Sequence, residues 1–265
     1  MSATIPSERT AFETIAERLS PTAAAQDPQS QSTIIAAARN EIFRLSSIVG
    51  RMASAFLSVP HDSGTGVYVG DEIANLLGEV FIQMLQICKV CGIDLRLSVL
   101  SKMELNGRKY PVELCKGKSG KYTKYSQQTG ITKTEGQSTL YNDINNISLE
   151  SHESEQEADT ETIEGVTLLL RQFALDRLWD RFHTPRNVAL ALIGEVGELA
   201  ELFQWSGDVD ETKSGDQTAG LVAIGWKDEE VDKVGQEIAD VTIYLIRLAD
   251  VCGVSLGQVS LKLVG

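Results

Sequence analysis

Four acidic side chains of the chain form two pairs with the same spacing. Glu195 and Glu198 lie three residues apart in the stretch VALALIGEVGELAELF, and Glu237 and Asp240 repeat the spacing in VGQEIADVTIYLIRLADVCG. Side chains three positions apart share one face of a helix within about one turn. Two such helices packed face to face would bring four carboxylates together.

The stretches around these pairs are otherwise apolar. Apart from three glutamates, residues 188–203 hold only apolar side chains and glycine. A helix apolar on nearly all sides is expected to be buried, where an isolated carboxylate is costly. Arg247 is the only basic residue between positions 234 and 253, so nearby cations are too few to pair the acids. We therefore expect a cage for Mg²⁺, which binds through carboxylates, waters and substrate phosphates.

A single ExxE pair is also compatible with a solvated helix face or with lysine partners elsewhere. Two pairs in the order ExxE then ExxD, in apolar helices separated by a polar loop, favour the metal site. This arrangement resembles the all-α nucleoside triphosphate pyrophosphatase superfamily (MazG-like), in particular its dCTP pyrophosphatase branch. Residues 179–205, WDRFHTPRNVALALIGEVGELAELFQW, are similar to the first half of that branch, and residues 234–253 to its second metal helix.

The resemblance implies an all-α fold, as do the long 3.6-residue periodicities and the weak strand signal. It also implies Mg²⁺-dependent hydrolysis of a nucleoside triphosphate between the α and β phosphates, giving the monophosphate and pyrophosphate. The implied substrate is dCTP or a modified cytosine nucleotide, and the implied role is sanitation of the nucleotide pool. A dUTP preference stays open, because the sequence does not settle the base.

The resemblance further assigns individual side chains. Its metal ligands are Glu195, Glu198, Glu237 and Asp240. Glu198 is our candidate for orienting the attacking water. The base-pocket positions are Trp179, His183, Trp205 and Tyr244. Taken singly, each aromatic is compatible with core packing and His183 with a structural role at a helix start, but the set beside the acidic pairs favours a pocket.

Internal similarity divides the chain into two copies of one helical unit. Arg39 and Asn40 align with Arg186 and Asn187 at an offset of 147, which also carries Phe56 onto Phe203. Farther on, VCG at residues 90–92 aligns with VCG at 251–253 at an offset of 161. The difference falls in the loop between the metal helices, where insertions are tolerated.

The first copy has lost the acidic set. At the four carboxylate positions it carries Ile48, Arg51, Leu76 and Glu79. A competing register places Glu72 and Asn75 at the last two positions, and neither register restores four carboxylates. We infer that the first copy cannot hold the metal by itself.

The second copy ends before any equivalent of the basic segment that follows the metal helices in the first copy. That segment, SKMELNGRKYP, contains Lys102, Asn106 and Lys109, whose counterparts in the family are associated with the substrate phosphates. We hypothesise an intramolecular pseudo-dimer in which these three side chains complete the site of the second copy. The alternative is a decayed first copy and a second copy with a truncated C-terminus. A homo-oligomer is the other assembly that the family implies.

These boundaries predict a disordered N-terminus at 1–32, with a possible short helix near residues 10–19, and a first copy at 33–126. A flexible acidic linker at 127–164 and a second copy at 165–265 follow. A net charge of −13 argues against nucleic-acid partners. The sequence contains no stretch of about 18 uncharged apolar residues, so we expect no membrane-spanning helix. Four cysteines suggest reduced thiols and a cytoplasmic protein, although nuclear and organellar locations stay open. The competing function is a non-catalytic module that oligomerises with a complete paralogue.

Overall fold

The computed structural model describes residues 32–60, 69–118, 162–205 and 220–265, together with Ile15, Gly66 and Thr160. Every regular element within these residues is helical, which confirms the predicted all-α fold. The elements are α2 (Ser32–Ala55), η3 (Phe56–Ser58), α3 (Gly70–Cys91), α4 (Leu95–Lys109), α5 (Val112–Cys115), α7 (Ile163–Asp176), α8 (Pro185–Gln204), α9 (Gly220–Ala223), α10 (Asp228–Val251) and α11 (Leu256–Val264).

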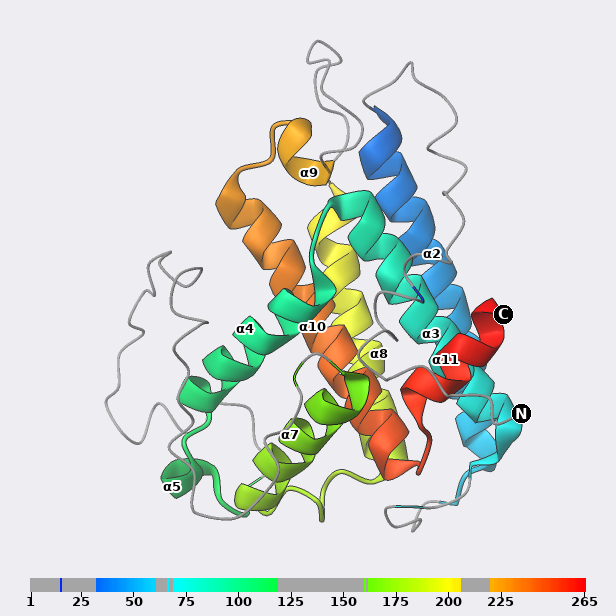
Figure 1. The fold of residues 1–265 in the computed structure, drawn as a ribbon, viewed down its shortest axis with the longest axis vertical. Helices are drawn as coiled ribbons and strands as arrows, with labels where there is room; N and C mark the ends of the chain where they lie inside the picture. The colour runs from blue at the N-terminus through cyan, green and yellow to red at the C-terminus, as the bar shows by residue number, and fades with distance from the viewer. Residues whose placement is uncertain are drawn as a thin grey trace, which may run out of the picture.

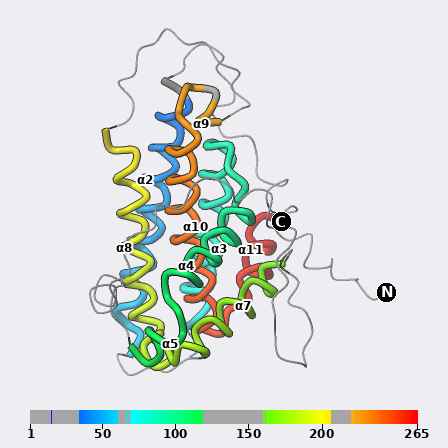
Figure 2. Tube along the Cα trace, turned by 90° about the vertical axis from the view of Figure 1, so that its left-hand side faces the viewer, coloured from blue at the N-terminus to red at the C-terminus, as the bar shows by residue number. Residues whose placement is uncertain are grey.

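Four long helices form the body of the molecule. Figures 1 and 2 show α2, α3, α8 and α10 lying side by side, with the shorter helices α4, α7 and α11 against their flanks. α2 packs on α3, α8 packs on α10, and α2 also contacts α8. One continuous apolar core runs through the four helices, and its largest fully buried side chains include Leu45, Phe81, Leu192 and Phe203.

Local signals in the sequence explain where these helices begin and end. The Thr184 hydroxyl accepts a hydrogen bond from the backbone N–H of Asn187 at 3.3 Å, and Pro185 takes the first helical position of α8, as predicted. α3 and α10 are followed by Gly92 and Gly253, whose φ angles of 70° and 67° favour glycine. The caps thereby fix the lengths of the two helices that meet α8 and α2.

Short helices cross from each half of the chain to the long helix of the other half. α4 from the first half packs on α10, and α11 from the second half packs on α3 (Figure 1). Two arginines make matching contacts: Arg39 Nε donates to the Phe203 carbonyl at 2.9 Å, and an Arg186 amine donates to the Phe56 carbonyl at 2.7 Å. These four residues are paired by the 147-residue offset, which supports the interpretation of an internal repeat.

The predicted boundaries fall partly outside the described residues. In the proposed linker, residues 127–159 and 161 lie outside the described residues. The proposed disordered N-terminus also lies outside them, except for Ser32 and Ile15. Ile15 is helical and buried. α7 begins at Ile163, two residues before the predicted start of the second copy, because the Thr162 hydroxyl accepts from the Gly165 N–H at 2.9 Å. The second helical unit therefore includes a capped N-terminal turn that the sequence pattern did not place.

The prediction that residues 188–203 are buried on nearly all sides is wrong, because Leu190 is 67% exposed and Ile193 is 37% exposed on the outer face of α8.

In the described part of the chain one helix, α3, is long and apolar enough to cross a membrane. In that helix 61% of the apolar window is buried in the core, which is equally typical of a core helix.

Candidate metal and nucleotide site

Three of the four predicted metal ligands come together where α8 crosses α10. Oxygen atoms of Glu195, Glu237 and Asp240 all lie within 4.8 Å of one another. Octahedral Mg²⁺ with bonds of about 2.1 Å holds its ligand oxygens roughly 3 to 4 Å apart, so small side-chain rotations bring the three into range. Glu198, one turn along α8 from Glu195, is exposed and lines the adjoining cavity but is not one of this tight set.

The donor set fits a divalent cation. Glu237 Oε2 is buried and has no hydrogen-bond partner among the described residues. A buried carboxylate oxygen without a partner is unfavourable, and a cation at this point would satisfy it. Lys102 of α4 offsets part of the negative charge, with its Nζ 2.5 Å from Asp240 Oδ2. Lys109 also lowers the pKa values of Glu237 and Asp240, but two ammonium groups against three converging carboxylates still leave the cluster short of positive charge.

The pKa values of the three carboxylates are raised, as expected for a cluster with an excess of negative charge. Burial, followed by repulsion from Asp240, Glu198 and Glu237, raises the pKa of Glu195 to about 7. Burial is also the main cause that raises the pKa values of Glu237 and Asp240, and Lys102 opposes the shift in both. A bound cation would favour the charged forms and reverse these shifts.

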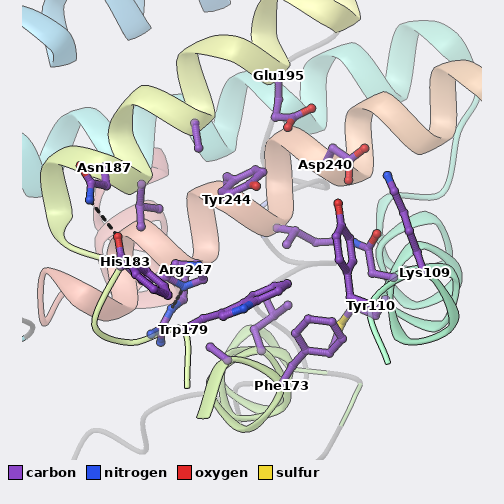
Figure 3. Close-up of a pocket in the computed structure, with 18 of the residues that line it drawn as sticks. Lys109, Tyr110, Phe173, Trp179, His183, Asn187, Glu195, Asp240, Tyr244 and Arg247 are labelled. Atoms are coloured by element: carbon purple, nitrogen blue, oxygen red, sulfur yellow. Dashed lines mark hydrogen bonds between the residues drawn. The ribbon is translucent and has the colours of Figure 1, made fainter. Parts of the chain in front are cut away.

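A cavity of about 580 Å³ adjoins the carboxylates, between α4, α7, α8 and α10. Figure 3 shows Glu195, Tyr244 and Asp240 along one side of this space, with Trp179 and Phe173 facing them. Polar groups from the first half of the chain, Asn106, Lys109 and Tyr110, line the end near Asp240. The cavity is therefore charged at one end and aromatic at the other.

Trp179 is held edge-on by other rings. Its ring centre lies 5.4 Å from that of Tyr110 and 5.9 Å from that of Phe173, in edge-to-face arrangements. Its indole N–H donates to the Cys115 carbonyl at 3.3 Å. Because Tyr110 and Cys115 follow α4, the tail of the first half positions an aromatic side chain of the second half.

A buried arginine supports the aromatic end. Arg247 of α10 is 5% exposed and donates to Asp250 Oδ2 at 2.5 Å, to Asp180 and, through Nε, to His183 Nδ1 at 3.1 Å. Burial and the charge of Arg247 lower the pKa of His183 to about 4. His183 is therefore neutral at physiological pH.

The structure brings most of the predicted site residues to one place. Those that line the cavity or lie beside it are Lys102, Asn106, Lys109, Trp179, His183, Glu195, Glu198, Glu237, Asp240 and Tyr244. Trp205 is not among them: it caps the C-terminal end of α8, is 87% exposed and does not line the cavity. The residues of α8 that line the cavity end at Glu198, and Trp205 lies seven residues beyond it, past the end of the helix.

Tyr110, Phe173, Asn187 and Arg247 line the cavity without having been assigned to the site. Tyr110 and Asn187 do lie inside the motifs that carried the resemblance, one position after Lys109 and one after Arg186, so that context was an available signal. Arg247 was noted only as a scarce cation. Phe173 carries no distinctive neighbours in the sequence, and only the fold places it against Trp179.

Comparison with known proteins gives partial relatives. The chain is 46% identical over 97 residues to dCTP pyrophosphatase 1 of Mus musculus, which covers 37% of this chain and 51% of that protein. It is 46% identical over 95 residues to dCTP pyrophosphatase 1 of Homo sapiens, covering 36% of this chain and 50% of the relative. No protein-family model matches. The chain thus spans about half the length of the curated relatives it matches, and the resemblance to the dCTP pyrophosphatase branch is confirmed over that part.

Proposed function

We propose that the protein is a Mg²⁺-dependent nucleotide pyrophosphohydrolase that converts dCTP, or a related deoxynucleoside triphosphate, to the monophosphate and pyrophosphate. The observation that carries this proposal is the convergence of Glu195, Glu237 and Asp240 beside a cavity whose other end is aromatic. The partial relatives named dCTP pyrophosphatase 1 support the cytosine nucleotide as substrate. Removal of such nucleotides from the pool is the cellular role that follows.

In this proposal Glu195, Glu198, Glu237 and Asp240 hold Mg²⁺. When bound there, Mg²⁺ neutralises charge on the phosphates. Glu198 faces the cavity from α8 and orients the water that attacks the α phosphorus. The bond between the α phosphorus and the bridging oxygen breaks, pyrophosphate leaves with that oxygen, and the proton of the water passes to a carboxylate or to solvent.

Positive side chains of the first half complete the phosphate end. Lys102 lies against Asp240, and Lys109 and Asn106 line the cavity beside it. Ammonium and amide donors in these positions would bind phosphate oxygens of the substrate and stabilise charge during the reaction. The site is then shared between the two halves, as in the pseudo-dimer hypothesis.

Apolar side chains on the outer surface support a further proposal about assembly. Phe43 on α2 and Leu190 on α8 are 73% and 67% exposed, and the two helices contact each other. Trp205 at the end of α8 is exposed as well. We propose that these exposed apolar side chains mediate homo-oligomerisation, that a second chain covers them, and that the protein acts in the cytoplasm. Light scattering of the wild type and of Leu190→Glu tests it, since loss of the oligomer is expected only in the variant.

The function is tested by measuring pyrophosphate release from a panel of the four deoxynucleoside triphosphates and dUTP, with and without Mg²⁺. We expect Mg²⁺-dependent turnover, with dCTP as the preferred substrate. Glu198→Gln should lower the rate of this turnover strongly, since the attacking water loses the carboxylate that accepts its hydrogen bond. Absence of Mg²⁺-dependent turnover by the pure wild-type protein would instead favour a non-catalytic module that pairs with a complete paralogue.

A further inference from the structure

The aromatic end of the cavity contains a histidine whose ring nitrogens are distinguished by their neighbours. Arg247 Nε lies 3.1 Å from His183 Nδ1. A guanidinium is always protonated and can only donate, so Nδ1 must be the acceptor and carry no proton. A neutral imidazole then carries its proton on Nε2. His183 lines the cavity, and the group that it can offer to a ligand is this Nε2–H donor.

Arg247 is itself too constrained to release this arrangement. Its two terminal amines are bound to Asp180 and Asp250, and its side chain is 6% exposed. Asp250 is held in turn by Arg171 of α7. Turning the guanidinium away from His183 would break a buried ion-pair network, which is strongly destabilising. The network therefore fixes the tautomer of His183 as well as its position.

The neighbouring amide is oriented by the same kind of argument. Asn187 Nδ2 donates to the Phe182 carbonyl at 2.9 Å, and a carbonyl can only accept, so this atom must be the nitrogen (Figure 3). The remaining amide oxygen is an acceptor, and Asn187 lines the cavity one turn along from His183. The aromatic end thus holds one donor and one acceptor, each fixed by a hydrogen bond to a neighbouring residue.

We propose that His183 Nε2–H and Asn187 Oδ1 form a reading pair for a base edge that carries an amino donor beside a ring-nitrogen acceptor. Cytosine presents this edge through its amino group and N3. Uracil and thymine present the reverse, a carbonyl beside a ring N–H, and would meet donor with donor and acceptor with acceptor. The pair deepens the proposed function, on which it rests, by naming the side chains that select cytosine over uracil. Arg247 is then a positioning residue, because it acts through His183.

The first test is selectivity in pyrophosphate release. His183→Phe keeps a flat ring but removes the donor, and Asn187→Ala removes the acceptor. Each is expected to lower the ratio of kcat/KM for dCTP to that for dUTP about tenfold or more, chiefly through loss of dCTP turnover, because a polar edge is left unpaired. Asn40→Ala is the matched control, since Asn40 is the exposed counterpart of Asn187 in the first half. Variants that stay active with the wild-type ratio would overturn the proposal.

The second test does not need turnover. In a long-range ¹H–¹⁵N spectrum of the wild-type protein, His183 should show a pyridine-type Nδ1 and a pyrrole-type Nε2, assigned by the loss of these signals in His183→Phe. The reverse assignment would overturn the proposal. If the wild type hydrolyses no triphosphate, the proposed function fails, and the reading pair is then judged by titration with dCMP and dUMP. Preferential binding of dCMP that is lost in His183→Phe would support the pair, and equal binding of both would overturn it.

Discussion

Each half of the chain contains a pair of long helices in similar positions, but the two pairs differ in the charges that they bring together. In the second half, α8 and α10 bring together Glu195, Glu237 and Asp240. In the first half, α2 and α3 bring together Arg51 and Glu79, which form an ion pair at the positions aligned with Glu198 and Asp240. The first pair of helices neutralises its own charge, whereas the second needs a cation from elsewhere.

The helices that cross between halves show the same contrast. Lys102 of α4 reaches Asp240 on α10. The 161-residue offset places Leu263 of α11 at the equivalent position, and there it packs so closely on α3 that a Cβ added to Gly78 would lie 2.8 Å from its Cδ1. An ammonium faces the charged cluster in one half, and an aliphatic side chain fills the space in the other. The comparison teaches that similar helix pairs can leave an acidic cluster open in one half and can neutralise or fill the matching positions in the other.

Removal of one clustered carboxylate should have the largest effect. Asp240→Asn removes a charge at the centre of the cluster, and we expect Mg²⁺-dependent kcat to fall on the order of 100- to 1,000-fold. Pyrophosphate release measures this. Glu201→Gln is the control, because Glu201 is an exposed acidic residue of α8, near Glu198, that does not line the cavity. Equal activity of the wild type and Asp240→Asn would show that the carboxylate cluster takes no part in the reaction.

The contribution of the first half should be next in size. Lys102→Ala and Asn106→Ala each remove a donor to the phosphates, and hydrogen bonds to charged groups contribute about 1.5 to 3 kcal/mol. We therefore expect kcat/KM to fall about 10- to 100-fold for Lys102→Ala and less for Asn106→Ala. Lys262→Ala, on the exposed surface of α11, serves as control. Unchanged turnover in both site variants would make the first half a scaffold only.

Protonation of the cluster should give a moderate, pH-dependent effect on stability. The pKa of Glu195 is raised to about 7 in the folded protein, above its ordinary value of 4.5. Stability from this group is complete below the ordinary value and is lost as pH rises through about 7. Without metal, the melting temperature should fall between about pH 5 and pH 8 in the wild type and fall less in Glu195→Gln. Mg²⁺ at pH 8 should restore the wild type. A flat profile in both proteins would contradict the assigned pKa.

The smallest effect is expected in the first half. Arg51 and Glu79 have side chains that are 55% and 36% exposed, and such surface pairs contribute about 0 to 1 kcal/mol. Arg51→Ala should therefore leave dCTP hydrolysis unchanged and shift the denaturation midpoint only slightly. A large loss of activity would show that the first half holds more of the site than the comparison indicates.

Local features of the sequence predicted the fold and the acidic cluster well. The cap at Thr184 and Pro185 and the i, i+3 carboxylate pairs depend only on helix geometry, which short stretches encode. The exposed positions of Trp205 and Leu190 depend on which helix faces stay uncovered, and periodicity does not encode that. The roles of Tyr110 and Arg247 arise from contacts 64 to 69 residues away along the chain, between Tyr110 and Trp179 and between Arg247 and His183.

Metal binding itself tests the central claim most directly. Titration of the metal-free protein with Mn²⁺, followed by electron paramagnetic resonance, reports the site without any need for turnover. We expect the wild type and Arg51→Ala to bind Mn²⁺ with equal affinity, and Asp240→Asn and Glu237→Gln to bind it at least tenfold more weakly. Wild-type affinity in both carboxylate variants would contradict a metal site formed by α8 and α10.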